Sequence, residues 1–324
     1  MVTVGAGRGI FPSERGVSSA FMSSSPVPYL AYVQILAGAL LLSTGSTVIK
    51  SVHFGVLELA GWRAAVIALF LLVAVRPPRI CWDRALIPAA LAHGITTLLF
   101  MWGNKLTAAA TGIFLQYTAP LYLLLLGPWL LKEPFQRRDL GIVGLIAVGM
   151  ALLLLEPVQT STHASNPGLG SLVAATCGIA WAFTTLTMRG LSRQPHEGFR
   201  RAIAAVILAN GCLAAGLLPV VGIPAQATPM DWGLVTYMGV FQLGVAFILI
   251  SLGLRRVGAF EGSLLLLVEP LLSPLWAYVI HGEAPGVLVW LGGGLVLLAS
   301  VLRLRASVHP TTTVPTPAAS HRRG

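Results

Sequence analysis

Trp232–Leu254 reads WGLVTYMGVFQLGVAFILISLGL, 23 residues without a single Asp, Glu, Lys or Arg. Uncharged runs of similar length recur at Tyr29–Ile49, Ala85–Asn104 and Leu106–Leu131. A helix needs about 20 mostly apolar residues to cross the hydrocarbon core of a bilayer, where it satisfies its own backbone hydrogen bonds. The runs therefore predict an integral membrane protein built of helices, with the lipid bilayer as its surroundings.

The composition of the whole chain agrees with this prediction. Of 324 residues, 56% are hydrophobic and only 10% are charged, whereas a soluble domain carries about 25% charged residues. The net charge of +10 comes from basic residues in short loops between apolar runs, which is how membrane topology is encoded, so we expect no nucleic-acid partner. Cys81, Cys177 and Cys212 are scattered, and they predict neither a disulfide framework nor a metal site or cofactor.

Charged residues, prolines and glycines divide the chain into ten predicted membrane-spanning helices, so the expected fold class is an all-α membrane protein. The predicted spans are Tyr29–Ile49, Leu59–Val75, Ala85–Asn104, Ala108–Leu131, Leu140–Leu155, Leu169–Met188, Ala202–Val221, Trp232–Leu254, Val257–Ile280 and Gly286–Leu302.

The distribution of basic residues predicts the orientation of these helices. With the N-terminus placed in the cytoplasm, 18 of the 21 Lys and Arg residues fall on the cytoplasmic side, and Lys50, Arg63 and Lys105 are the exceptions. Cytoplasmic loops of membrane proteins carry such an excess. We therefore expect a multi-pass protein of the cell inner membrane with both termini in the cytoplasm.

An internal repeat divides the chain into two halves. A shift of 150 residues superposes Pro120 on Pro270, Glu133 on Glu283 and Gly144 on Gly294. We expect a first five-helix repeat at residues 28–156 and a second at 157–305, with disordered cytoplasmic segments at 1–27 and 306–324. Because five is odd, the second repeat enters the membrane from the opposite side, which predicts two inverted repeats around a shared site at the bilayer midplane.

Several motifs resemble the EamA domain of the drug/metabolite transporter superfamily. They are Thr107–Pro120 (TAAATGIFLQYTAP), Leu131–Pro134 (LKEP), the glycine-spaced Gly141–Gly149, Val268–Pro270 (VEP) and His281–Glu283 (HGE). The resemblance covers roughly Tyr29 to Leu304. It implies a ten-helix carrier of small metabolites, with helices 1–4 and 6–9 around a central cavity and helices 5 and 10 outside it. Members of the family often carry a Trp in the first helix where this chain has Leu42–Gly45.

Polar residues near the centres of the spans are candidates for binding substrate or protons, because polar groups in lipid need partners. The candidates are Glu269, His93, Gln116, Tyr117, Asn210 and Gln242, to which Trp181 is added as part of an aromatic wall. None of them suggests catalysis.

Glu269 is the only acid near a span centre, and it precedes Pro270, which removes a helix hydrogen bond. One reading makes it a carboxylate that couples transport to protons or binds a cation. The other makes it a protonated acid that joins packed helices, with Gln242 or His93 as its partner. His93 could relay protons or donate a structural hydrogen bond.

The remaining charged residues are interpreted as structural. Glu133 and Glu283 are expected to mark helix starts, and Arg63 is expected to form a pair with Glu58 at the membrane rim. No Lys or Arg is then expected near a span centre, which favours neutral, zwitterionic or cationic solutes over phosphorylated ones.

Together these patterns predict a secondary transporter, and an exporter of small metabolites such as amino acids or amines. It would work by alternating access as a monomer or homodimer, either coupled to protons or not. The alternatives are a channel or facilitator, a membrane-embedded enzyme and a sensor. A channel would need a polar stripe along several helices, and an enzyme would need clustered catalytic groups.

Overall fold

A computed structural model describes residues 29–75, 83–119, 121–122, 137–155, 165–192, 197–254, 256 and 265–308. Within these ranges the chain is helical and contains no β-strand. The principal elements are α1 (Tyr29–Ser43), α2 (Gly45–Ser51), α3 (Val56–Val75), α4 (Leu86–Leu106), α5 (Ala109–Gln116), α7 (Arg137–Leu155), α8 (Pro167–Ser192), α9 (Gly198–Val221), α10 (Pro229–Tyr237), the π-helix η1 (Met238–Val245), α11 (Ala246–Leu254), α13 (Val268–His281) and α14 (Val287–Val308).

The described elements agree with most of the predicted spans. Six helical segments are long and apolar enough to cross a membrane, and shorter apolar helices occupy Leu140–Leu155 and Val287–Leu302. The chain is thus a multi-pass membrane protein. Three spans predicted as continuous differ, because α5 and α13 are short and each adjoins a turn, and a turn at Thr44 divides the first span. The C-terminal segment predicted as disordered from residue 306 begins inside α14, which continues to Val308, and residues 1–27 lie outside the described ranges.

Eight helical segments form a closed ring of pairwise contacts. Each of the following segments contacts the next one around the ring: α5, α8, α4, α9, α3, the α10–η1–α11 segment, α1 with α2, and α13, which contacts α5 again. These segments belong to the first four and the sixth to ninth predicted spans. The arrangement therefore agrees with the one that the family resemblance implies, and we call it the ring.

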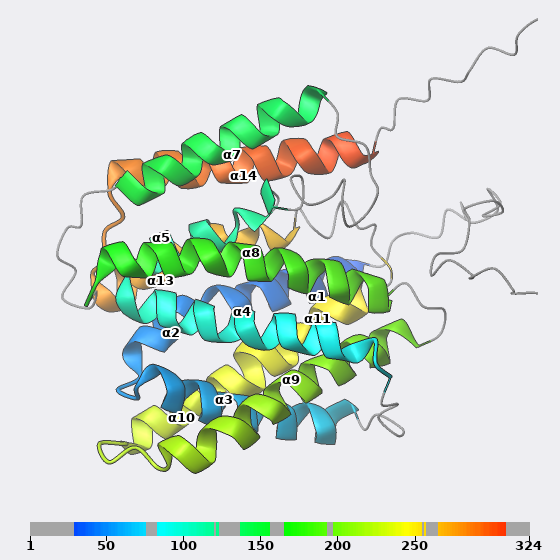
Figure 1. Ribbon diagram of the computed structural model, residues 1–324, viewed down its shortest axis with the longest axis vertical. Coiled ribbons are helices and arrows are strands. Elements are labelled where there is room, and N and C mark those ends of the chain that lie inside the picture. Colours follow the sequence, from blue (N-terminus) through cyan, green and yellow to red (C-terminus); the bar gives the residue numbers. More distant parts are fainter. Residues whose placement is uncertain are drawn as a thin grey trace, which may run out of the picture.

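The two remaining helices, α7 and α14, pack against each other along one side of the ring (Figure 1). Their backbones approach closely where Gly149 meets Gly292. A Cβ atom added to Gly292 would lie 2.6 Å from the carbonyl oxygen of Gly149, and one added to Gly149 would lie 2.8 Å from that of Gly292. Small residues permit such close crossings between helices in membranes.

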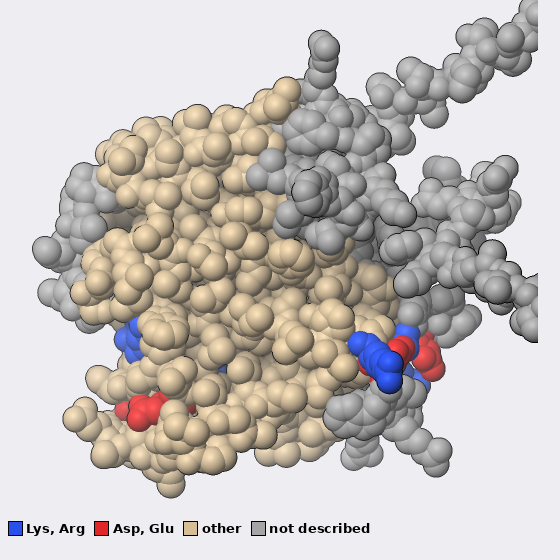
Figure 2. Space-filling view, in the orientation of Figure 1, with Lys and Arg blue, Asp and Glu red and all other residues tan. Residues whose placement is uncertain are grey.

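The outer surface of the molecule suits a lipid environment. Large apolar side chains such as Leu69, Leu91 and Leu172 are 60% or more exposed. On the face shown in Figure 2, the described Lys, Arg, Asp and Glu side chains lie at the two ends of the molecule, and a broad band between the ends has none. A water-soluble protein rarely exposes so large an apolar surface, whereas lipid covers it without penalty.

We expect Gly149→Ala and Gly292→Ala each to destabilise the protein by about 1–3 kcal/mol, because the new methyl group overlaps a backbone carbonyl. Gly144→Ala and Gly294→Ala, on the same two helices, are the matched controls, because nothing lies within 4 Å of a Cβ atom at either position. Alanine there should be neutral or stabilising, since it favours the helix. Thermal unfolding of the detergent-solubilised protein compares the stabilities of the four variants. Equal effects of all four substitutions would contradict the close crossing.

Candidate functional site

Two helices of the ring are interrupted at corresponding positions of the two sequence repeats. α5 ends at Gln116 and is followed by a turn at Tyr117–Thr118, and a turn at Leu267 precedes α13. The repeat offset of 150 residues superposes Tyr117 on Leu267. Interrupted helices at matching positions of two halves are the best structural pointer to a transporter's binding site, because the break frees backbone groups inside the membrane.

A hydrogen bond joins these two interruptions. The hydroxyl of Tyr117 donates to the Oε2 atom of Glu269 at 3.0 Å, and it lies 3.4 Å from the carbonyl oxygen of Leu266. Glu269 therefore lies in the first turn of α13 instead of the middle of a continuous helix. Its partner is Tyr117, so the prediction of a contact with Gln242 or His93 is wrong.

The first span is also interrupted, at Thr44 between α1 and α2. Residues of the second half surround this break. Trp276 donates its indole N–H to Ser43 Oγ at 2.9 Å, and the Tyr237 hydroxyl lies 3.1 Å from Thr44 Oγ1. Gln242, on the π-helix, donates to the Leu42 carbonyl oxygen at 3.4 Å. Where family members often have a Trp in the first helix, this chain has a helix break that a Trp from α13 contacts.

A separate polar group lies where α3, α4 and α9 meet. Arg63, the eighth of 20 residues in α3, is only 3% exposed, and its Nε and Nη1 atoms have no hydrogen-bond partner among the described residues. α3 contacts both α4, which carries His93, and α9, which carries Asn210. Glu58 instead accepts a hydrogen bond from the Gly55 backbone N–H at 2.7 Å. The predicted rim pair of Arg63 with Glu58 is therefore wrong.

The position of Arg63 also overturns the expectation that no cation lies deep in a span. Seven residues of helix separate it from the start of α3, a rise of about 10 Å. An arginine in the middle of a membrane helix costs about 2.5–3.5 kcal/mol. The sequence could have predicted the depth of Arg63 in α3, because the apolar run continues on both sides of this residue. It could not have predicted that Arg63 and Glu58 do not pair.

His93 and Asn210 are both inside the ring. The His93 ring lies 5.9 Å from the ring of Phe247 on α11, which is not a neighbour of α4 in the ring, so His93 points across the interior. Asn210 is fully buried, and its amide nitrogen donates to the Val206 carbonyl oxygen at 2.8 Å. Within the described part of the chain, neither Asn210 Oδ1 nor either ring nitrogen of His93 has a hydrogen-bond partner.

The other two predicted site residues do not join these groups. Gln116 is buried at the end of α5, and its Oε1 atom has no partner among the described residues. Trp181 is half-buried on α8, and its backbone carbonyl accepts a hydrogen bond from Thr185. No contact in the described structure connects Trp181 with the other predicted site residues. The described ranges also contain no cluster of three or more His, Cys, Asp or Glu side chains that could hold a metal ion.

A buried ion pair lies at one end of the ring, where α2, α5 and α13 meet. Lys50 Nζ lies 2.5 Å from Glu283 Oε1, and the two side chains are 1% and 7% exposed. The second carboxylate oxygen of Glu283 accepts from the backbone N–H of Ala109 at 3.1 Å. Glu283 thus connects the two halves of the chain, and the interpretation of this residue as a helix-start marker is wrong. Glu133, its counterpart in the first half, lies outside the described residues.

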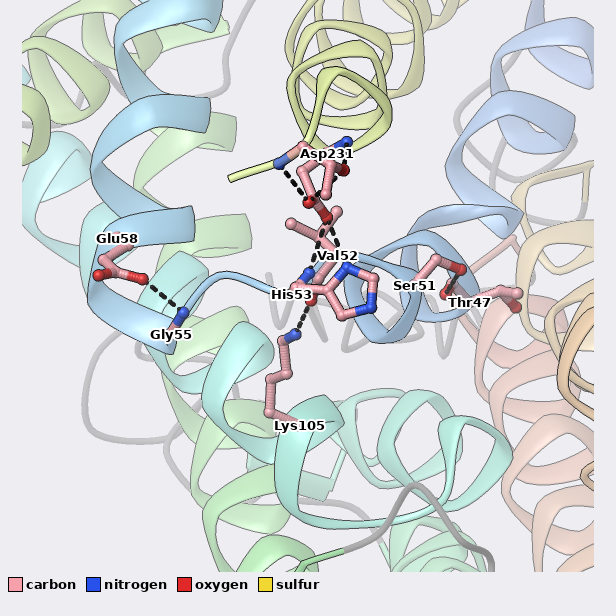
Figure 3. Close-up of polar contacts among 9 residues, drawn as sticks. Thr47, Ser51, Val52, His53, Gly55, Glu58, Lys105 and Asp231 are labelled. Carbon is pink, nitrogen blue, oxygen red and sulfur yellow. Dashed lines mark hydrogen bonds and ion pairs between the residues drawn. The ribbon is translucent and has the colours of Figure 1, made fainter. Parts of the chain in front are cut away.

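Further polar contacts at this end join α4 and α10 to the segment that follows α2. Figure 3 shows Lys105 reaching the carbonyl oxygen of Val52, and His53 beside Asp231. Asp231 accepts from the backbone N–H and the Nδ1 atom of His53 at 2.9 and 3.0 Å. It also completes a capping box with Thr228 at the start of α10. The basic-residue count predicts that this end faces outward, and we call the Lys50–Glu283 pair together with these contacts the outer seal.

At the opposite end of the ring, Arg201 at the start of α9 pairs with Asp83, which precedes α4. The backbone N–H of Ala85 and the guanidinium of Arg201 hold the pKa of the Asp83 carboxyl below its usual range. This pair is partly exposed, so it contributes little to stability. It nevertheless joins the two halves at the end opposite the outer seal.

Comparisons with known proteins agree with this architecture. An "Uncharacterized transporter" of Methanothermobacter thermautotrophicus is 26% identical over 287 residues, which cover 87% of this chain and 78% of that protein. An "Uncharacterized transporter" of Archaeoglobus fulgidus is 27% identical over 225 residues, 68% of this chain and 76% of that protein. A crystal structure with 20% sequence identity superposes with a TM-score of 0.58 over 86% of this chain and 98% of that one, which shows a shared fold.

The model of the EamA-like transporter family matches residues 29–155 and 168–305. These ranges include every segment of the ring as well as α7 and α14. The motifs, the eight-segment ring and the match over most of the chain lead to one conclusion: this protein belongs to the EamA-like transporter family.

Proposed function

We propose that this protein is a secondary transporter that exports small zwitterionic metabolites, such as amino acids, by alternating access coupled to protons. The observation that carries the proposal is the hydrogen bond between Tyr117 and Glu269, which joins two helix interruptions at corresponding repeat positions. Transporters place substrate and ion sites at such interruptions. The proposed site is the interior of the ring in an inner membrane, with both termini in the cytoplasm.

The proposed mechanism uses the relation between the two halves. If the five-helix repeats are inverted, each arrangement of one half against the other has a counterpart that opens toward the other side of the membrane. The contacts at the two ends of the ring support this mechanism, because Lys50–Glu283 and Asp83–Arg201 both connect residues of different halves. Opening one end requires the pairs at that end to separate.

Glu269 supplies the proposed coupling. An ionised carboxylate is costly inside a membrane, so it gains from either a proton or the positively charged amine of a solute. Because one carboxylate cannot hold both at full strength, proton and solute compete for it. Competition at a shared site produces exchange of one for the other, and an inward proton gradient then drives export. The Tyr117 hydroxyl can stabilise the ionised form while neither is bound.

The alternative functions fit the described residues less well. The polar groups form separate clusters on different sides of the ring, and a continuous polar stripe, which a channel would need, is not present in the described ranges. A hydrolytic enzyme would need a third group to orient the base beside its nucleophile, and among the described residues no side chain other than Tyr117 bonds to Glu269.

In vesicles containing the purified protein, Glu269→Gln should abolish accumulation of a radiolabelled amino-acid mixture driven by a pH gradient, and solute exchange should weaken because the neutral amide no longer attracts the amine. Gln keeps the shape of the side chain but cannot lose a proton. Glu269→Asp keeps the carboxylate and should be impaired less. If Glu269 only packs between helices, Glu269→Asp should be impaired more than Glu269→Gln, because Gln can still form a hydrogen bond and Asp is too short. Normal gradient-driven accumulation by Glu269→Gln would exclude coupling through this residue.

The outer seal gives an independent prediction about alternation. Glu283→Gln leaves Lys50 buried without its counter-ion, and loss of one partner of a buried pair costs about 3–5 kcal/mol. The conformation closed at this end should therefore lose population to the one that is open there. A cysteine replacing Ser46, which is 1% exposed and lies one turn before Lys50, reports the opening.

With the three native cysteines replaced by alanine, an impermeant maleimide applied from outside should label Ser46→Cys at least about tenfold faster in the Glu283→Gln background. Glu58→Gln is the control, because Glu58 is bonded only to the nearby backbone and should leave the labelling rate unchanged. Equal rates with and without Glu283→Gln would show that the ion pair does not hold this end closed.

A further inference from the structure

The buried guanidinium of Arg63 is the feature of the ring that the proposed coupling does not use. Arg63 is 3% exposed, and the Nε and Nη1 donors are completely buried without a hydrogen-bond partner among the described residues. Buried charges in membrane helices pair with one another, bind backbone carbonyls or mark the path of a substrate. The described part of the chain places no carboxylate within ion-pair distance of Arg63.

Arg63 faces the interior of the ring. α3 contacts α4, and the His93 ring of α4 reaches across the interior to Phe247 on α11. α3 also packs against α9, where Gly61 contacts Leu217 and Leu218, and Ile67 shares a hydrophobic cluster with Ile207. Because the two helices run in opposite directions at this contact, Arg63 and Asn210 lie at similar depth along it. Gly94, beside His93, likewise faces Leu213 of α9, so the three polar residues lie at similar depth on neighbouring helices.

We propose that Arg63 binds the carboxylate group of the transported solute. This inference rests on the proposed function and adds a second binding point to it. A guanidinium offers parallel N–H donors that match the two oxygens of a carboxylate. It also explains why an arginine persists in the ring without a protein partner among the described residues, since the solute provides the missing counter-ion.

The number of charges favours a carboxylate over a phosphate. One guanidinium neutralises one carboxylate, whereas a phosphate with two negative charges would leave one uncompensated in a low-dielectric interior. The described residues beside Arg63 add no second cation that is held permanently charged. They add Asn210 Oδ1 and the two ring nitrogens of His93, which have no partner within the described ranges. Asn210 Oδ1 and the unprotonated nitrogen of a neutral His93 can each accept from an N–H or O–H group on the same solute.

The cation and the acid of the interior lie on different sides of the ring. Arg63 is on α3, which contacts α9 and η1, while Glu269 is on α13, which contacts α1 and α5. The proposed carboxylate site at Arg63 is therefore separate from the proposed coupling site at Glu269, and one solute can reach both only if a chain separates its amine from its carboxylate.

The test measures binding at equilibrium, without a pH gradient. The probes are an equimolar mixture of the twenty standard amino acids and the matching mixture of their α-amides, in which the carboxylate charge is removed. The purified protein in detergent should be stabilised against thermal unfolding by the acids and not by the amides. An equal response to both mixtures, or no response to the acids, would overturn the proposal.

Substitutions then assign the effect to Arg63. Arg63→Gln should weaken the apparent affinity for the amino-acid mixture at least about thirtyfold, as expected when one partner of a buried charge pair is lost. Arg63→Lys keeps the charge, so its affinity for the mixture should lie between that of the unsubstituted protein and that of Arg63→Gln. Arg201→Gln is the matched control, because Arg201 pairs with Asp83 at the end of the ring and should leave the affinity unchanged. Binding by Arg63→Gln equal to that of the unsubstituted protein would exclude the site.

Stability without solute separates a binding role from a structural one. If Arg63 serves a ligand, Arg63→Gln and Arg63→Met remove an uncompensated buried charge, so their melting temperatures should equal or exceed that of the unsubstituted protein. Lower melting temperatures of both variants, or failure of both to fold, would show a structural role and overturn the proposal. The proposed coupling fails separately, because gradient-driven transport by Glu269→Gln does not depend on this equilibrium measurement.

Discussion

The hydrogen bond between Tyr117 and Glu269 connects the features on which the proposed mechanism depends. It exists because both helices that carry these residues are interrupted, and interruptions inside a membrane leave backbone groups that lipid cannot satisfy. The other helices of the ring enclose these backbone groups and keep them away from lipid. The same lack of water that makes the interruptions costly also makes a carboxylate there sensitive to protons and cations. Local backbone structure and proposed chemistry thus have a common physical cause.

The distribution of polar groups within the ring follows from this constraint. Near the break in the first span, hydroxyl groups of Ser43 and Thr44 bond to carbonyls of the preceding turn and to Trp276 and Tyr237 of the second half. The interior groups that have no described partner are concentrated in ring helices, while α7 and α14 meet through close-packed glycines. The glycine contact provides rigidity at the side of the molecule, and the ring retains the groups that could exchange partners.

Much of the fold could be predicted from the sequence, because lipid imposes strict limits on length and charge. The runs Ala85–Asn104 and Trp232–Leu254 correspond closely to α4 and to the α10–η1–α11 segment. What the runs could not predict was where a helix stops inside the membrane. The break at Thr44 occurs in apolar sequence without a charge or a local proline to mark it. The turn at Tyr117–Thr118 does have a local signal, because Pro120 cannot donate a helix hydrogen bond to the Gln116 carbonyl.

The candidate site was predicted less completely than the fold, because its contacts join residues that are far apart in the sequence. Glu269 and Tyr117 were both identified as polar residues within spans, but their contact joins residues 152 positions apart. Arg63 was assigned to the wrong surroundings because Glu58 is near in sequence, whereas burial depends on α4 and α9. Lys50 was identified only as an exception to the cytoplasmic bias of basic residues, and Glu283 was treated as a helix-start residue. Only their juxtaposition at 2.5 Å shows an ion pair between the halves.

The central claim is that Glu269 gains and loses a proton beside Tyr117, and infrared difference spectroscopy tests it most directly. Spectra of the protein in lipid, recorded between acidic and alkaline buffer, should contain the C=O band of a protonated carboxyl group that is absent from Glu269→Gln. The band should shift in Tyr117→Phe, because that substitution removes the hydroxyl that bonds to the carboxyl group. A carboxyl band unchanged by Glu269→Gln across the same buffers would contradict proton binding at Glu269.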